Sequence, residues 1–451
     1  MNEKLVLIGA GSVSFTRGLV VDVINHGWAG ELGLVDPDPD ALRVAEGLVR
    51  KYLDAAGSKI KLSASVERKD VLPGATVVIT TIGVGSRRAW EQDVFIPRKY
   101  GIYQPVGDTV MPGGTSRALR MIPPMVDIAR DVLDLCPDAL FFNYANPMSP
   151  VCRGVRKATG ANVVGLCHGV PHVVNMLSWY LGIEASRFNY TAVGINHLTW
   201  FTDILVDGED IMPQLRAVAR AKLGRAVSRD DLPPVPVGAN LDPDGDTFTW
   251  ELVDLFGAFP AVMDRHVTEF FGHMFGGEGA YFGQTLGSEE NFSFEGTIAA
   301  GDECFAWMKE FAFSPEPMTK DDFGKIGGEQ EQAIEMIEAI RNDAQRVYSA
   351  NLPNIGQVPN LPRDAVIECP CYFDTHGVSP VFTDPMPAAL AGTLASRFQW
   401  VETTVESAME GSRDKFVQAL LLDGACKSIT QAAQLADELL EAQADHLPNF
   451  A

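Results

Sequence analysis

The first 36 residues carry the pattern that most constrains how this chain can fold: a strand, a glycine turn, a helix and a second strand ending in an acid. The short apolar run Lys4–Gly9 leads into Gly11, and the apolar periodicity of Phe15–Ile24 predicts a helix. Gly9 permits a tight turn, and Gly11 lets the backbone approach a pyrophosphate that sits on the helix N-terminus. The pattern predicts a dinucleotide-binding unit of the Rossmann type.

The second strand, Glu31–Val35, ends in Asp36, about where an acid binds the hydroxyls of the adenosine ribose. No arginine follows at once, which favours NAD over NADP. Ser14 stands where the usual third glycine would be. The alternative is a glycine turn of an unrelated α/β protein, with Asp36 a turn residue before Pro37. The residues that we expect at the cofactor are Gly9, Gly11, Ser12 and Asp36.

Strand and helix patterns continue to alternate after this unit, which predicts a doubly wound parallel sheet with helices on both faces. Ligands bind such sheets beyond the carboxyl ends of the strands. Residues that follow expected strand ends, such as Asn146 and Cys167, should therefore gather at one edge. The expected segments are the strands Ala75–Ile82, Ala139–Phe142 and Asn162–Leu166 and the helices Ser116–Leu135 and Val151–Ala158.

The pattern changes near residue 190, where two short strands, Tyr190–Asn196 and Thr199–Val206, are followed by helices and irregular segments. We expect a Rossmann domain over residues 1–190 that binds NAD, and a mixed α+β catalytic and oligomerisation domain over residues 191–451. The later helices are expected at Glu329–Tyr348, Pro387–Met409, Ser412–Leu421 and Thr430–Ala444.

Composition excludes several classes of partner. The formal net charge of -23 argues against nucleic acid and anionic membranes, because neutralising phosphates requires clustered lysine and arginine. No apolar run is long enough to span a bilayer, and no basic segment precedes a long apolar stretch at the start. Seven scattered cysteines without a CxxC pair indicate reduced thiols. We therefore expect a cytoplasmic protein.

Cys167 and His197 each follow an expected strand, and their side chains are a soft and a borderline metal ligand. Together they could hold a divalent transition metal and leave positions open for substrate oxygens. The alternative is a buried thiol and a histidine with an ordinary hydrogen bond.

A second polar cluster contains Asp264, Arg265, His266 and Glu269 in a stretch rich in glycine and phenylalanine. Ionisable groups this close can shift one another's pKa and serve as acid, base or carboxylate grip. A structural ion-pair network explains the segment equally well.

The loop Gly107–Gly114 precedes a helix that carries Arg117 and Arg120, which suits an oxygen-rich or anionic ligand. A capped helix with surface arginines is the alternative. Asn146 stands before Pro147 at an expected strand end, where a simple turn is also possible.

Taken in order, these segments resemble glycoside hydrolase family 4, the NAD- and metal-dependent glycosidases, over nearly the whole chain. The segments that carry the resemblance are Ile8–Ser12, Gly107–Gly114 with Arg117 and Arg120, Asn146–Met148, Cys167–Gly169, Gly194–His197, Asp264–His266 with Glu269, Pro359–Pro362 and Val366–Pro370.

The resemblance implies a fold similar to lactate and malate dehydrogenases and a route unlike the two-carboxylate mechanism. NAD would oxidise the sugar at C3, a base would remove the C2 proton, and the leaving group would depart by elimination. Water would then add, and C3 would be reduced again. A divalent metal, manganese in this family, would hold the C2 and C3 oxygens and stabilise the enolate.

The resemblance also implies residue roles. Cys167 and His197 match metal ligands, and Asp264 is the candidate base for the C2 proton. His168 is a candidate acid or substrate contact. The expected substrate contacts are Asn146, Arg117, Arg265, His266 and Glu269.

The form Cys167-His168-Gly169 resembles members that act on unphosphorylated α-glucosides, α-galactosides and α-hexuronides. Arg117, Arg120 and Arg265 could pair with a uronate carboxylate. The resemblance further implies a homodimer or homotetramer.

Two other functions are open on the residues alone. A dehydrogenase of a 2-hydroxy acid or sugar acid is indicated by the predicted Rossmann domain alone. Such an enzyme does not need the pair Cys167 and His197. A non-enzymatic NAD sensor would not need a polar cluster as dense as Asp264–Glu269.

Overall fold

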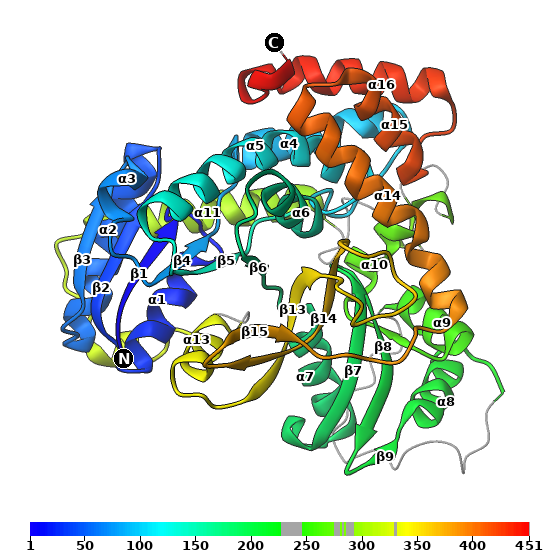
Figure 1. Cartoon of the computed structure of the whole chain (residues 1–451), viewed down its shortest axis with the longest axis horizontal. Helices are drawn as coiled ribbons and strands as arrows, with labels where there is room; N and C mark the ends of the chain where they lie inside the picture. Colours follow the sequence, from blue (N-terminus) through cyan, green and yellow to red (C-terminus); the bar gives the residue numbers. More distant parts are fainter. Residues whose placement is uncertain (227–245, 275–279, 282–283, 286–292, 329–331, 451) are drawn as a thin grey trace.

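The computed structural model describes residues 1–226, 246–274, 280–281, 284–285, 293–328 and 332–450. Its first half contains the predicted alternation of strands and helices (Figure 1). The elements are β1 Asn2–Ile8, α1 Thr16–Asn25, β2 Ala29–Val35, α2 Pro39–Ala56, β3 Lys61–Ser65, α3 Arg68–Val71, β4 Val77–Thr80, α4 Ser86–Lys99, α5 Met111–Leu135, β5 Leu140–Asn143, α6 Met148–Thr159, β6 Val163–Gly165 and α7 Gly169–Leu181.

Helix α2 shows how the local sequence sets these bounds. The Asp38 carboxylate accepts hydrogen bonds from the backbone N–H groups of Asp40 and Ala41, and Pro39 occupies the first turn, where no N–H is needed. Gly57 ends the helix with a φ of 64°, a conformation that glycine adopts without a steric penalty.

The second half is a mixture of strands and helices. The strands are β7 Phe188–Ile195, β8 Leu198–Val206, β9 Glu209–Asp210, β10 Phe259–Pro260, β11 Ala280–Tyr281, β12 Gln284–Thr285, β13 Arg346–Pro353, β14 Val366–Asp374 and β15 Gly377–Pro380. The helices are α8 Met212–Lys222, α9 Thr247–Phe256, α10 Asp264–Phe270, α11 Phe294–Phe313, α12 Lys320–Phe323, α13 Ala333–Arg341, α14 Ala388–Glu410, α15 Arg413–Asp423 and α16 Ile429–Ala442.

One large sheet runs through both halves in the order β10-β8-β7-β14-β13-β6-β5-β4-β1-β2-β3. The strands from β3 to β6 are parallel, whereas the pairs from β6 to β13 and onward are antiparallel. The predicted fold class, a Rossmann-type parallel sheet with a mixed second half, is confirmed. The division of the chain at residue 190 stays a prediction.

The helix expected over Glu329–Tyr348 is wrong in its second part. Residues 329–331 lie outside the described residues, α13 ends at Arg341, and the next segment is strand β13. This strand pairs with β14 along its whole length, from Arg346 opposite Phe373 to Pro353 opposite Val366. Strand pairing with a distant segment overrides the local helical pattern.

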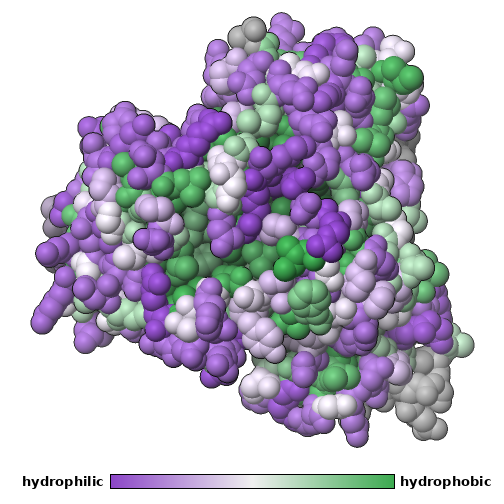
Figure 2. Space-filling view, in the orientation of Figure 1, coloured by the Kyte–Doolittle hydropathy of each residue, from purple (hydrophilic) through white to green (hydrophobic). Residues whose placement is uncertain are grey.

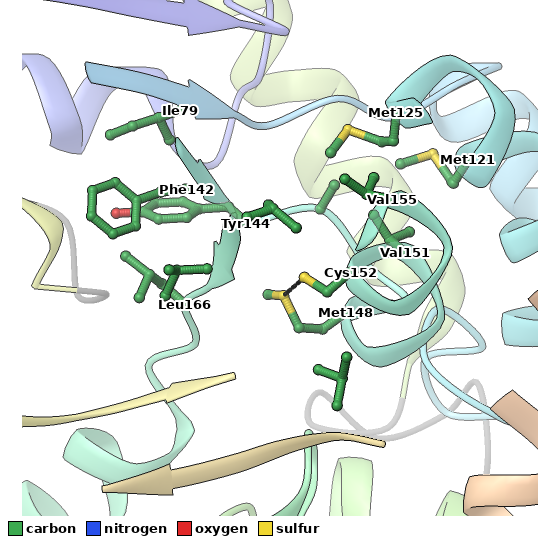
Figure 3. Packing of buried hydrophobic residues seen from close by; sticks show 14 of the residues in the cluster. Ile79, Met121, Met125, Phe142, Tyr144, Met148, Val151, Cys152, Val155 and Leu166 are labelled. Carbon is green, nitrogen blue, oxygen red and sulfur yellow. Dashed lines mark hydrogen bonds between the residues drawn. The ribbon is translucent and has the colours of Figure 1, made fainter. Parts of the chain in front are cut away.

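The main hydrophobic core extends through both halves of the chain, and the part shown in Figure 3 contains Ile79 of β4, Phe142 of β5, Met121 and Met125 of α5, and Val151 and Val155 of α6. Met148 and Cys152, one helical turn apart on α6, are in sulfur contact at 3.9 Å. Asn143, at the end of β5, donates to the Met148 sulfur and to the Ala145 carbonyl. These contacts of Asn143 hold the turn that follows β5 and contains Asn146.

On the face seen in Figure 2, hydrophobic residues gather toward the middle and hydrophilic residues dominate the periphery. Among the described residues, no helix combines the length and apolar character that a membrane crossing requires.

Candidate active site

The glycine turn after β1 has little room for side chains. Gly9 has a φ of +94°, and a Cβ there would lie 2.8 Å from the backbone nitrogen of Ile82. A Cβ on Gly11 would lie 2.7 Å from the Ala41 side chain. Because neither position tolerates a side chain, this tight turn between β1 and α1 requires glycine at both positions.

Asp36, at the end of β2, holds this turn directly. Its Oδ2 accepts a hydrogen bond of 2.8 Å from Gly11 N, and its Oδ1 accepts one from Asp38 N. Burial raises the pKa of this carboxyl. Ser12 accepts a hydrogen bond from Phe15 N at the entry to α1. The structure therefore brings the four expected cofactor residues together at one strand edge.

A chain of contacts connects this turn with a second polar region. The Thr81 hydroxyl donates to the Gly9 carbonyl, and Gly83, two residues on, faces the Arg117 guanidinium. Arg117 Nε donates to the Asn146 carbonyl at 3.1 Å, and Asn146 Nδ2 donates to Asp108 Oδ2 at 3.0 Å. The expected substrate contacts Arg117 and Asn146 thus lie between the glycine turn and Asp108.

Asp108, His197 and His266 come from three separate segments, and one potential ligand atom of each lies within 4.8 Å of the others. Asp108 lies in the loop before α5, His197 in the tight turn between β7 and β8, and His266 on α10. The two imidazole rings have their centroids 4.5 Å apart. Two nitrogens and a carboxylate oxygen are a suitable donor set for a divalent transition metal.

Burial keeps both histidines neutral at neutral pH. It lowers the pKa of His197 to about 4 and that of His266 to about 3. Burial by itself raises the pKa of Asp108, but electrostatic interactions with the His197, His266 and Arg117 side chains and the Thr109 hydrogen bond bring it below its ordinary value. Neutral imidazoles beside an ionised carboxylate are the protonation states that metal binding requires.

Glu368 supports the turn that carries His197. It lies buried on β14 and accepts hydrogen bonds from Asn196 Nδ2 at 3.2 Å and from Thr199 Oγ1 at 3.0 Å. Ser349 donates to its other oxygen. Burial raises the pKa of Glu368. The carboxyl therefore ties both sides of the β7–β8 turn to β14.

Cys167 and His168 follow β6 at the same edge of the sheet. Cys167 is partly buried, and its Sγ accepts a contact of 3.5 Å from Gly169 N. It is not among the residues whose ligand atoms cluster with His197. His168 is exposed at the start of α7, and its charge lowers the pKa values of His197 and His266. The ligand role of Cys167 stays a prediction, and His168 lies within electrostatic reach of the histidine pair.

Asp264 has a structural role at the start of α9. Its carboxylate accepts hydrogen bonds from Phe248 N at 3.0 Å and from both Thr249 N and Thr249 Oγ1 at 2.7 Å. These residues form the first turn of α9, so Asp264 caps that helix. Burial raises the pKa of Asp264 to about 6. The cap uses three of the acceptor positions of the carboxylate, and the role of Asp264 as the base for the C2 proton stays a prediction.

Glu269 and Arg265 also face protein groups. Glu269 Oε1 accepts hydrogen bonds from Val106 N at 2.9 Å and Gly107 N at 2.8 Å, which anchors the loop that carries Asp108. Burial raises the pKa of Glu269 to about 8. Arg265 donates to the Thr297 hydroxyl on α11 at 2.5 Å. The second oxygen of Glu269 and the Nε of Arg265 are buried without a hydrogen-bond partner among the described residues, and the expected substrate contacts of both side chains stay predictions.

Arg120 does not point into the site. It forms a bidentate ion pair with Asp93, and both side chains are fully buried. Its Nε donates to the Val84 carbonyl. The expectation that Arg120 pairs with a substrate carboxylate is therefore wrong, because its charge is already compensated inside the protein.

Sequence reasoning missed Asp108 as a candidate metal ligand, although it predicted an oxygen-rich or anionic ligand at the loop Gly107–Gly114. The spacing alone could not show that His197 and His266, 89 and 158 positions later in the chain, lie close to Asp108 in the fold. It also missed Thr109, whose hydroxyl lies between Asp108 and His197. The sequence signal that could have indicated both residues is the polar pair Asp108 and Thr109 directly after Gly107.

Comparisons with known proteins cover nearly the whole chain. Residues 4–183 match the model of family 4 glycosyl hydrolases, and residues 192–426 match that of the family's C-terminal domain. An α-glucosidase of Erwinia rhapontici is 30% identical over 98% of this chain and 98% of the relative. An α-galactosidase of Bacillus subtilis is 28% identical over 99% and 100%, and an α-galacturonidase of the same organism is 29% identical over 97% of each.

Solved structures show the same fold. A 6-phospho-α-glucosidase from gut microorganisms, in complex with NAD and Mn²⁺, superposes with a TM-score of 0.82 at 18% identity over 100% of both chains. A malate dehydrogenase of Cryptosporidium parvum gives 0.52 at 14% identity, over 91% of this chain and 99% of that one. The family models, which match both halves, and the relative that is 30% identical establish that the chain belongs to family 4 of the glycosyl hydrolases.

Proposed function

We propose that this enzyme hydrolyses an unphosphorylated α-glycoside, an α-glucoside, α-galactoside or α-hexuronide, with NAD and a divalent metal, Mn²⁺, as cofactors. The observation that supports this function best is the group Asp108, His197 and His266 beside the glycine turn. Relatives named α-glucosidase, α-galactosidase and α-galacturonidase, each covering nearly the whole chain, support the substrate class.

The residues at the glycine turn fit a dinucleotide. Gly9 and Gly11 form the tight turn between β1 and α1, and Asp36 follows β2, at the place where an acid binds the ribose in such units. Bound NAD supplies a hydride acceptor that returns the hydride within the same turnover. The protein's part is to hold the dinucleotide in place through Gly9, Gly11, Ser12 and Asp36.

The polar group likewise fits a divalent metal. His266 Nδ1 is buried and has no hydrogen-bond partner among the residues that the structure describes. Asp108, His197 and His266 would hold the ion, with Cys167 as the further ligand that the family resemblance implies. The ion supplies Lewis acidity toward the sugar hydroxyls. Arg117 and Asn146, which border Asp108, would orient the sugar, and His168 would contact it from α7.

The experiment is a screen of p-nitrophenyl α-glucoside, α-galactoside, α-galacturonide and 6-phospho-α-glucoside, with and without NAD and MnCl₂, under reducing conditions. We expect nitrophenol release only with both cofactors, only from unphosphorylated sugars, and without net NADH. Release that persists in EDTA without nucleotide would contradict the proposal. Stoichiometric NADH would instead identify the dehydrogenase that the Rossmann half alone allows.

Matched variants separate the site from the scaffold in the same assay. Asp108→Asn removes a proposed metal ligand, and we expect it to abolish most of the release. Asp127→Asn alters an exposed ion pair on α5, and we expect it to retain wild-type release. Equal activity of the two variants would contradict the placement of the metal.

We also propose that the protein is cytoplasmic and forms a homodimer or homotetramer. No disulfide joins any of its seven cysteines, all of which the structure describes, and this supports a reducing compartment. Size-exclusion chromatography with light scattering tests the oligomer, and a monomer at working concentration would contradict it.

A further inference from the structure

The Thr109 hydroxyl lies between two members of the proposed metal group. Its Oγ1 is 2.7 Å from Asp108 Oδ1 and 2.9 Å from His197 Nδ1. Only 4% of Thr109 is exposed, and 7% of His197, so water does not compete for these contacts. The hydroxyl is therefore shared between the carboxylate and the imidazole.

The donors and acceptors in this chain can be assigned one by one. An ionised carboxylate only accepts hydrogen bonds, so the single proton of the Thr109 hydroxyl goes to Asp108. The hydroxyl oxygen can then only accept from His197, which places a proton on Nδ1. A neutral imidazole carries one proton, and His197 Nε2 is left with its lone pair.

We propose that Thr109 is a positioning residue that fixes His197 in the Nδ1–H tautomer and so presents Nε2 as a metal ligand. Metal-binding histidines usually donate their second ring N–H to a carboxylate, a carbonyl or water, and this bond orients the ring. Here the Thr109 hydroxyl accepts the hydrogen bond from His197 Nδ1–H and donates its own proton in a hydrogen bond to Asp108. The inference extends the proposed function, since it concerns the same metal site.

Two further contacts separate the role of the hydroxyl from the shape of the loop. Glu269 anchors the loop through Val106 N and Gly107 N, without using the Thr109 side chain. Glu368 holds the His197 turn from the other side through Asn196 and Thr199. Because both segments are held independently, replacing the hydroxyl by a methyl group should leave their backbones in place.

The experiment measures Mn²⁺ affinity of the full chain without NAD or substrate, by calorimetric titration after removal of metal with EDTA. Thr109→Val removes the hydroxyl at nearly constant volume, and we expect its Kd to rise about 10- to 100-fold. Thr109→Ser keeps the hydroxyl, so this variant should bind Mn²⁺ with a Kd within about threefold of the wild-type Kd. Thr202→Val is the control, because Thr202 also donates to a neighbouring aspartate, Asp203, but at an exposed position on β8.

The tautomer is read directly from ¹⁵N-histidine spectra of the metal-free protein, with His197 assigned by its loss in His197→Gln. We expect the Nδ1–H pattern for wild type and Thr109→Ser, and its loss in Thr109→Val. An Nε2–H pattern in wild type would overturn the inference, as would a Thr109→Val affinity equal to that of wild type.

The two proposals fail in different ways. If wild type binds no Mn²⁺, the proposed function fails, while the wild-type tautomer still decides the role of Thr109. If Thr109→Val does not fold, the wild-type spectrum decides it by the same criterion.

Discussion

Arg120 on α5 and Asp93 on α4 form a bidentate ion pair in which neither side chain has any exposed surface. Arg120 also donates to the Val84 carbonyl, in the loop after β4. The pair therefore ties two helices and a loop at the strand edge that carries the glycine turn. The Asp93 carboxylate is the ion-pair partner of the Arg120 guanidinium, so the loss of the carboxylate charge leaves the Arg120 charge buried without its partner.

Asp93→Asn should lower the free energy of unfolding by about 3–5 kcal/mol, because it leaves the Arg120 charge unpaired in the interior. Chemical denaturation followed by circular dichroism measures this. The control is Asp127→Asn, which breaks an ion pair whose side chains are 59% and 58% exposed. Exposed pairs contribute at most about 1 kcal/mol. Similar losses in the two variants would show that the buried pair is not stabilising.

Asp264→Asn tests the helix cap against the expected base. Asparagine retains one acceptor oxygen for Thr249 but turns an amide toward Phe248 N, so we expect a loss of about 1–2 kcal/mol in stability. Turnover at saturating substrate should stay within about tenfold of wild type, since a general base contributes about 10²–10⁴-fold. Thermal unfolding and kcat are measured on the same preparation.

A fall of about 1,000-fold or more in the kcat of Asp264→Asn, with unchanged thermal stability, would support Asp264 as the base. Asp264→Ala, which loses all three hydrogen bonds, should be less stable than Asp264→Asn if the cap is its role.

The sequence predicted the N-terminal half of the fold well because buried parallel strands appear as short apolar runs between turn signals. The run Ala75–Ile82 became β4 in this way. Strand β14 was not predicted, because Glu368 and Pro370 interrupt its apolar pattern. One oxygen of Glu368 accepts hydrogen bonds from Asn196 and Thr199, about 170 positions away, and no local pattern reveals these partners.

The candidate site was predicted only in part, because the order of the strands places residues at strand ends but does not show which distant groups they contact. Residues at strand ends, such as Asn146 and His197, could be placed at one edge from the order of the strands. Asp264 and Arg120 could not be judged, because a cap and a buried ion pair depend on which distant group each carboxylate or guanidinium meets. Their residue types suit both a structural and a catalytic role.

Glu269 should make the stability of the protein depend on pH. Burial raises the pKa of this carboxyl from its ordinary 4.5 to about 8 in the folded state. Between these values the unfolded chain releases the proton and the folded chain keeps it, so the folded state binds more protons and stability falls as pH rises. Below about pH 4.5 both states are protonated, and the contribution of Glu269 to stability is fully present.

Glu269→Gln keeps an acceptor oxygen for Val106 N and Gly107 N and cannot ionise. We therefore expect its unfolding free energy, measured without added metal or NAD, to fall less than that of wild type between pH 5 and pH 8. The exposed Glu441→Gln serves as control and should show the wild-type slope. A Glu269→Gln slope equal to the wild-type slope would mean that Glu269 is ionised throughout the range.

Cys167→Ser tests the metal ligand that the family resemblance implies and that the cluster of Asp108, His197 and His266 does not contain. Serine is a poor ligand for a transition metal compared with a thiolate, so we expect the Mn²⁺ affinity of the variant to fall about tenfold or more. Calorimetric titration of the metal-free protein under reductant measures the change. Cys426→Ser, at a partly buried thiol of the C-terminal region, is the control and should bind Mn²⁺ as wild type does. If Cys167→Ser also binds as wild type, the ion is held by the carboxylate and the two histidines without the thiol.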